Sequence, residues 1–150
     1  MRRRVSMPGI VLTDEEMRYI ALFEEFTGVV VKDCIIDRER NRIIFVVKEG
    51  QVGKAVGRSG SRIKMLNKLL NKSVEVVEYS DNLEDMIRKS LFPARVNAIK
   101  VAKTANGKKV VIVSVPPSDK GIAIGRDGRN VSRARILAKR YFGIDKVMIA

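Results

Sequence analysis

Two short segments bounded by glycine are the residues of this 150-residue chain best suited to bind a ligand. They are Gly57-Arg58-Ser59-Gly60 and Gly125-Arg126-Asp127-Gly128. Glycine has no Cβ, so it lets the backbone turn sharply and lets another backbone approach closely. A helix is expected after each segment, and its first N–H groups and positive dipole end can hold a phosphate. We therefore predict two phosphate-binding loops, each with an arginine at its first variable position.

Each predicted site extends into the helix that follows the loop. Basic side chains are expected along one face of these helices, namely Arg62, Lys64 and Lys68 in the first and Arg129, Arg133 and Arg140 in the second. Four apolar side chains are candidates for a groove that would hold bases, namely Val56, Ile63, Ile124 and Val131. The alternatives are a solvated helix face for the basic residues and an ordinary core role for the apolar ones. Asp127 should repel phosphate, but residues 81–150 carry a net charge of +9 against +4 for residues 1–80, so the sequence does not rank the two sites.

The composition favours a polyanionic partner and gives no support for an enzyme. Lysine and arginine total 30 against 17 acidic residues, a net charge of +13, which favours nucleic acid. No run approaches the roughly 20 apolar residues of a membrane-spanning helix. The chain has no histidine and one cysteine, Cys34, which removes the usual zinc spacings and the commonest general base. We expect Cys34 to be a buried strand residue, and we expect no catalytic residue, no metal and no cofactor.

The first half of the chain carries helix and strand signals in a defined order. Thr13 and Glu16 have the spacing of a capping box, which starts a helix. The expected elements are a helix from residue 13, strands at 29–37 and 42–48, helices at 52–56 and 61–70, and a strand at 73–79. The two strands are separated by a polar turn and form a hairpin. This half therefore has the order α-β-β-α-α-β.

The second half repeats this order. Its expected elements are a helix at 81–91, a hairpin around Asn106-Gly107, a short helix capped by Ser118-Asp119, a long helix, and a strand at 146–149. Gly53, Ala55, Gly57, Arg58 and Gly60 recur 68 residues later as Gly121, Ala123, Gly125, Arg126 and Gly128. The last strands match only after a slip of two residues, so we expect a longer final helix or loop. An internal repeat of this kind predicts an α+β protein of two similar domains.

The expected organisation is a loose basic N-terminal arm at 1–12, one domain at 13–80 and a second at 81–150. No Gly/Ser-rich or Pro-rich spacer separates the two domains. The segment that joins them is an amphipathic helix, which is marginal in water unless its apolar face is buried. We therefore predict that the domains pack as one rigid unit.

The repeated unit, with Gly-x-x-Gly between its last two helices, resembles the type II KH fold. Three strings resemble the paired KH domains of NusA, the transcription termination and antitermination factor: VGKAVGRSGSRIKMLNKLLNKSVEVVEY, SLFPARVNAIKV and KGIAIGRDGRNVSRARILAKRYFGIDKVMI. The resemblance covers about residues 10–150, and its most specific pieces are Pro93–Val96 and Ile122–Arg126.

The resemblance implies that the loop, helix and groove residues named above bind single-stranded RNA, since a KH module clamps about four nucleotides. Bacterial NusA also has an N-terminal polymerase-binding domain and an S1 domain. This chain is too short for either and resembles the short archaeal form. The resemblance implies action in transcription elongation, termination or antitermination, and RNA polymerase as a further partner. We expect a cytoplasmic monomer that binds no membrane. The alternative is a KH protein of ribosome assembly or a structural ribosomal protein.

Overall fold

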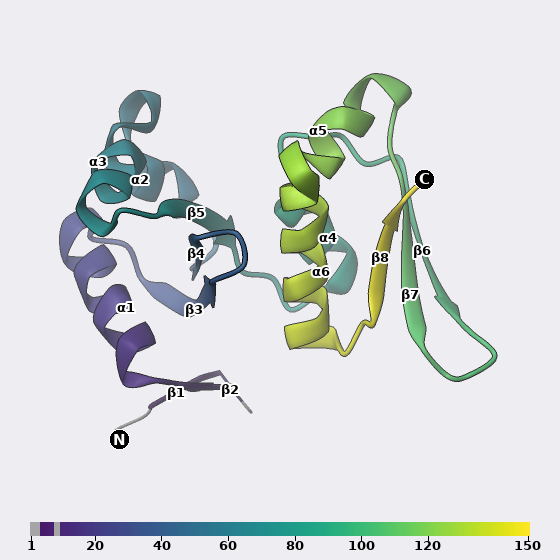
Figure 1. Ribbon diagram of the computed structural model, residues 1–150, viewed down its shortest axis with the longest axis horizontal. Coiled ribbons are helices and arrows are strands. Elements are labelled where there is room, and N and C mark those ends of the chain that lie inside the picture. The colour runs from purple at the N-terminus through teal and green to yellow at the C-terminus, as the bar shows by residue number, and fades with distance from the viewer. Residues whose placement is uncertain (1–3, 8–9) are drawn as a thin grey trace. The chain divides into compact units, whose positions relative to one another are not determined.

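The computed structural model of the chain describes residues 4–7 and 10–150. The chain divides into two compact units, Met1–Tyr79 and Ser80–Ala150, which are described separately below (Figure 1). The division comes one residue before the boundary expected from the sequence. Both units contain the order α-β-β-α-α-β, preceded in unit 1 by two short strands, which confirms a tandem α+β architecture.

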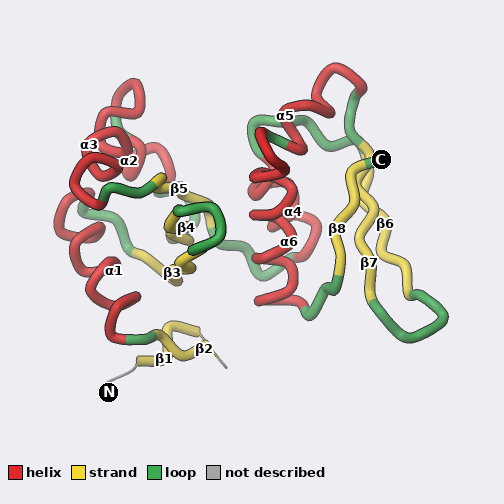
Figure 2. The backbone as a smooth tube through the Cα atoms, in the orientation of Figure 1, coloured by secondary structure: helices red, strands yellow, loops and turns green. Residues whose placement is uncertain are grey.

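Unit 1 is a three-stranded sheet with helices on one face (Figures 1 and 2). Its elements are β1 (Arg4–Met7), β2 (Ile10–Leu12), α1 (Asp14–Thr27), β3 (Val31–Asp37), β4 (Arg42–Val47), α2 (Val52–Val56), η1 (Arg58–Gly60), α3 (Ser61–Leu70) and β5 (Ser73–Glu78). The sheet order is β3-β4-β5, with β4 antiparallel to β3 and parallel to β5. Parallel neighbours need a crossover connection. Helices α2 and α3 form it, so the first glycine loop lies within the crossover.

Unit 2 repeats this topology. Its elements are α4 (Leu83–Leu91), β6 (Ala98–Lys103), β7 (Lys109–Ser114), η2 (Pro117–Asp119), α5 (Lys120–Ile124), η3 (Arg126–Gly128), α6 (Arg129–Phe142) and β8 (Lys146–Ile149). The sheet order is β6-β7-β8, again with one antiparallel and one parallel pair. Within the described ranges, no helix combines the length and apolarity needed to cross a membrane.

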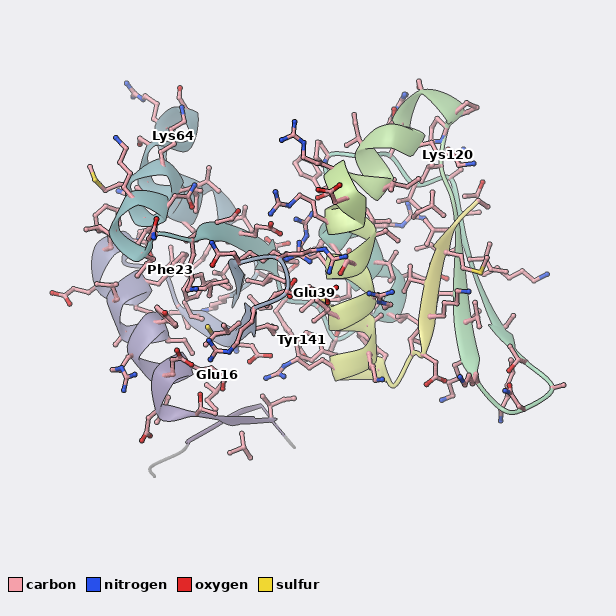
Figure 3. The ribbon with its side chains drawn as sticks, in the orientation of Figure 1. Glu16, Phe23, Glu39, Lys64, Lys120 and Tyr141 are labelled. Atoms are coloured by element: carbon pink, nitrogen blue, oxygen red, sulfur yellow. The ribbon has the colours of Figure 1, made fainter. Side chains whose placement is uncertain are left out.

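Each unit has its own apolar core. In unit 1, the ring of Phe23, which is labelled in Figure 3, stacks on the ring of Phe45 with centroids 4.2 Å apart, which joins α1 to the sheet. Cys34 is buried in the same cluster, as expected. In unit 2, Ile87 and Leu91 of α4 pack with residues of β7 and α6. The capping box of α1 is also confirmed, because Thr13 and Glu16 exchange hydrogen bonds of 2.7 and 3.2 Å.

A buried arginine closes the turn end of the unit 1 sheet. Arg42 is 0% exposed, and its Nε lies 2.8 Å from a carboxylate oxygen of Asp37. Its Nη1 lies 3.1 Å from a carboxylate oxygen of Glu75. A buried charge needs this kind of pairing, because the desolvation cost is otherwise uncompensated. The ion pairs therefore tie both outer strands of the sheet to the central strand.

The N-terminal segment differs from the expected loose arm. Residues Arg4–Met7 and Ile10–Leu12 form an antiparallel pair of short strands, and Leu12 is buried in the core of unit 1. Ile10 and Val11 are β-branched, which favours a strand, and Leu12 gains stability from the burial of its side chain. Arg2 and Arg3 of the expected arm lie outside the described residues.

The shift between the two repeats is also larger than the expected two residues. Glu75 pairs with Ile44 in unit 1, whereas Met148 pairs with the equivalent Ile112 in unit 2, which is a slip of five residues. Helix α6 has 14 residues against 10 in α3, so most of the extra length is one additional helical turn. Apolar residues occur at helical spacing throughout this region, so the sequence pattern alone does not locate the insertion.

Candidate nucleic-acid interface

The two glycine loops have almost the same backbone conformation. Gly57 has φ 78° and ψ 175°, and Gly125 has φ 76° and ψ 170°. The next positive φ values are 53° at Ser59 and 55° at Asp127, and the final glycines have 72° and 70°. Three of the four residues in each loop thus have positive φ, which is rare for residues other than glycine. The repeat seen in the sequence is a repeat of three-dimensional geometry.

The first glycine of each loop is required by space as well as by conformation. A Cβ on Gly57 would lie 2.9 Å from Cγ of Arg62, and one on Gly125 would lie 2.7 Å from Nδ2 of Asn130. The last glycines are different, because a Cβ there would meet nothing closer than 3.8 Å. In each loop, therefore, only the backbone at the first glycine lies in close contact with the helix that follows.

Arg62 and Asn130 occupy the same position in the two repeats and make the same kind of contact. Arg62 Nη1 donates to the carbonyl oxygen of Lys54 at 2.5 Å. Asn130 Nδ2 donates to the carbonyl oxygen of Ile122 at 2.7 Å. Both bonds join the long helix after the loop to the short helix before it. Arg62 thus has a structural partner besides its predicted role, and Asn130 was missed although the repeat aligns it with Arg62.

The N-termini of α3 and α6, which follow the two loops, have some backbone N–H groups that are free to bind an anion and some that are already bonded. Some donors are used internally, since Gly60 N–H bonds to the Gly57 carbonyl at 3.2 Å and Gly128 N–H bonds to the Gly125 carbonyl at 3.1 Å. For the described residues, no side chain caps α3 or α6. An uncapped helix N-terminus carries a partial positive charge and free donors, and this is the usual setting for a bound phosphate.

The third residue of each loop, Ser59 or Asp127, is exposed, and its backbone conformation restricts which residue types fit there. Ser59 and Asp127 both adopt the left-handed conformation. Aspartate visits this region more readily than most residues, because its short polar side chain bonds locally. The carboxylate of Asp127 therefore suits the loop backbone, although it opposes an incoming phosphate. Arg58 and Arg126 are exposed beside these residues.

On α3, the predicted basic residues Lys64 and Lys68 are exposed, whereas Arg62 is half-buried. Figure 3 shows Lys64 extending away from unit 1. Both lysines lie on the solvent side of the helix that starts at the first loop. Their exposure agrees with the predicted RNA-binding role, which stays a prediction.

On α6, the expected stripe of Arg129, Arg133 and Arg140 is half-buried. Arg133 is engaged inside unit 2, because its Nε and Nη2 donate to the Ser90 carbonyl oxygen at 3.0 and 2.7 Å. Ser90 is in the last turn of α4, where carbonyl groups lack helical partners. Arg133 therefore fastens α4 to α6. The exposed basic residues of α6 are Arg135 and Lys139, which the predicted stripe did not include.

The four apolar groove candidates divide into two kinds. Ile63 and Val131 pack against the cores of their units. Val56 is half-buried, and Ile124 is 37% exposed. Exposed apolar surface beside the second loop also includes Ile122, at 46%. Of the two helices that flank the second loop, the short one therefore carries the exposed apolar side chains, whereas at the first loop the exposed ones are Met65 and Leu69 of the long helix α3.

A polar contact holds each short helix to the chain segment that precedes its sheet. In unit 2, Asp119 accepts the backbone N–H of Arg95 at 2.8 Å and its Nε–H at 3.0 Å. These hydrogen bonds lower the pKa of Asp119 to about 2. In unit 1, the Gln51 side chain accepts the backbone N–H of Val30 at 2.8 Å. Of the expected pair Ser118-Asp119, Asp119 is the N-cap residue of the short helix, but its carboxylate makes no capping hydrogen bond and binds Arg95 instead.

Comparison with known families gives two matches. Residues 17–106 match the family described as KH domain. Residues 83–148 match the family described as NusA-like second KH domain. The second match spans the loop at Gly125–Gly128 and most of unit 2.

Relatives of known name match over nearly the whole chain. A protein of Halococcus morrhuae named probable transcription termination protein NusA is 36% identical, covering 94% of this chain and 99% of its own. The protein of that name from Methanocaldococcus jannaschii is 33% identical, covering 95% and 76%. The crystal structure of APE1850 superposes with a TM-score of 0.82 at 44% identity, covering 93% of this chain and 100% of that one.

Proposed function

Since the chain belongs to the family of NusA-like transcription termination proteins with paired KH domains, we propose that it binds single-stranded RNA through its two Gly-x-x-Gly loops. The ligand we propose is nascent RNA, and the outcome is an effect on transcription elongation, termination or antitermination. We propose RNA polymerase as the protein partner and the cytoplasm as the place of action. The relatives carry the name of a transcription factor, which favours this reading over ribosome assembly and over an enzyme.

One observation carries the proposal. The loops share their dihedral angles to within a few degrees although their variable residues differ, Arg-Ser in one and Arg-Asp in the other. Each loop precedes a helix whose N-terminus no described side chain caps. The two repeats therefore share a backbone conformation that suits a phosphate, with an exposed arginine beside it.

Charge reversal in the loops tests the proposal. The variants are Arg58→Asp with Ser59→Asp in the first loop, and Arg126→Asp in the second. Because these side chains are exposed, folding stability should change by no more than about 0.5 kcal/mol. RNA affinity, measured by fluorescence anisotropy, should fall in both variants while circular dichroism stays unchanged. Unchanged affinity in both folded variants would show that the loops are not the phosphate site.

The form and length of the RNA give a second test. KH modules hold splayed bases while the loop holds the backbone, so single strands should bind more tightly than duplexes of equal length. Two modules of about four nucleotides each need a strand of about eight. If the domains form the predicted rigid unit, affinity should rise between about five and ten nucleotides, because the second contact becomes intramolecular. NMR relaxation should then give both units one tumbling time, and independent tumbling would contradict the rigid unit.

A further inference from the structure

A hairpin of unit 2 carries positive charge that the RNA loops do not account for. We call residues 98–114, which comprise β6, β7 and their turn, the lysine hairpin. The segment contains four lysines and no acidic residue. All four are exposed, namely Lys100, Lys103, Lys108 and Lys109. No hydrogen bond or ion pair to another described residue occupies their ammonium groups. The carboxylate nearby, on Asp145, accepts the backbone N–H of Lys109 at 2.8 Å.

Two of these lysines form a like-charge pair. Lys103 and Lys109 lie directly opposite each other on the antiparallel strands, at the last pair before the turn. Like charges in this position destabilise a sheet. The last pair before the turn in unit 1 is Asp37 and Arg42, which form an ion pair of 2.8 Å. The last pair before the turn is thus neutralised internally in unit 1. In unit 2, where the hairpin is one pair longer, the last pair is doubly positive.

The edge position of β6 explains only part of this charge. Lysine on an edge strand prevents pairing with other chains, and Lys100 and Lys103 can serve that purpose. Lys109 lies on β7, however, which is the central strand of the sheet, and Lys108 lies in the turn. Protection of an edge does not require charge at these two places, nor a repulsive pair within the hairpin. An anionic ligand would offset the repulsion.

We propose that the lysine hairpin is a second nucleic-acid contact, which binds the phosphodiester backbone of a single-stranded RNA that extends beyond the loop sites. The inference rests on the proposed RNA-binding function and adds a surface to it. Lysine acts here as a point charge toward phosphate and reads no base, so this contact is independent of sequence. Its ligand is the same RNA strand, because the net charge of the chain favours one polyanion throughout.

The geometry of unit 2 sets the RNA length that this contact needs. Figure 1 places the turn of the lysine hairpin and helix α5 at opposite ends of the sheet. Strand β7 has six residues, or roughly 20 Å at about 3.4 Å per residue. The loop at Gly125–Gly128 clamps about four nucleotides. A short RNA held there does not extend to the hairpin turn, whereas a longer one does.

The test compares two variants that each remove two positive charges from exposed positions. The first is Lys103→Gln with Lys109→Gln, in the hairpin. The matched control is Arg18→Gln with Lys48→Gln, in unit 1 and outside both loops. Each is titrated with unstructured RNAs of about five and about 20 nucleotides, at salt concentrations from about 50 to 200 mM.

The hairpin variant should bind the short RNA as the wild type does and the long RNA more weakly. Loss of two phosphate contacts lowers the salt slope by about 1.4. The affinity ratio of wild type to variant should therefore shrink about sevenfold between the two salt concentrations. The variant should be at least as stable as the wild type, because a repulsive pair has been removed.

Two results would overturn the inference. One is a hairpin variant whose salt slope with the long RNA equals that of the wild type or the control. The other is a loss that appears only with duplex DNA, which would assign the hairpin to a different nucleic acid. Failure of the proposed function would look different, because the Arg126→Asp variant would then keep full affinity for the short RNA whatever the hairpin variant does.

Discussion

The two glycines of the second loop should differ in what they contribute to stability, although they look alike in the sequence. The relevant changes are Gly125→Ala and Gly128→Ala. Gly125 has φ 76° and ψ 170°, a region that is almost confined to glycine and costs another residue about 1–3 kcal/mol. Gly128 has φ 70° and ψ 19°, the left-handed helical region, where alanine costs about 1–2 kcal/mol.

Contacts widen this difference. The new Cβ at Gly125 would lie 2.7 Å from Asn130 Nδ2 and 3.0 Å from the Asn130 backbone nitrogen. Asn130 would have to move and lose its bond to the Ile122 carbonyl, worth about 0.5–1.5 kcal/mol. Alanine also restricts the unfolded chain, which returns about 0.4–1 kcal/mol in both variants. The net cost should be about 2–3 kcal/mol for Gly125→Ala and about 1 kcal/mol for Gly128→Ala.

Urea unfolding followed by circular dichroism measures both costs, provided that the slope m is the same in all variants. Asn130→Ala supplies a control, because it removes the nearest side-chain atoms and the bond to Ile122. In that background the cost of Gly125→Ala should fall by about 0.5–1.5 kcal/mol. Equal costs for the two glycine variants, or no effect of the background, would refute the close approach of the loop to its own helix.

Three further predictions concern single charges. Replacing Arg42 by Met should cost about 3–5 kcal/mol in urea unfolding, because two mostly buried carboxylates lose their partner; a cost below 1 kcal/mol would contradict the buried network. The pKa of Asp119 falls from 3.8 to about 2 in the folded protein, so its contribution to stability is complete above pH 4 and is lost as the pH falls through about 2. Thermal unfolding of the Asp119→Asn variant should therefore depend less on pH than the wild type between pH 4 and 2, and an equally steep dependence would show that the Arg95 contact does not stabilise the fold. Asp127→Asn keeps a residue that tolerates positive φ and removes a charge that repels phosphate, so RNA affinity should rise severalfold at low salt; anisotropy titration checks this, and reduced affinity would mean that the carboxylate assists binding.

The sequence by itself determined the repeat, the order of elements and the position of the two loops. These features follow from local signals: a capping box at Thr13, apolar residues at helical spacing, a turn at Asn106-Gly107, and paired glycines. Each signal acts over a few neighbouring residues, so it can be recognised without knowledge of the rest of the fold. The same locality explains why the family resemblance could be found from short strings.

The tertiary structure decided which side chains are available to a ligand. Arg133 meets a carbonyl 43 residues away at Ser90, and Asp119 meets Arg95, 24 residues away. No local pattern encodes such partners, because they depend on how helices pack across the sheet. The RNA-binding role of the predicted site residues stays a prediction, but the structure separates those that are exposed from those that bond to other parts of the protein.

The difference between the two units is likewise a matter of packing. Asp37 and Arg42 neutralise each other at the end of one hairpin, while Lys103 and Lys109 repel at the end of the other. The letters alone do not reveal this contrast, since it depends on strand register, and a shift of one residue would put these side chains on opposite faces of the sheet. Register is set by the core that each sheet buries, so only the folded structure brings the charges into the pairs from which a second RNA contact can be inferred.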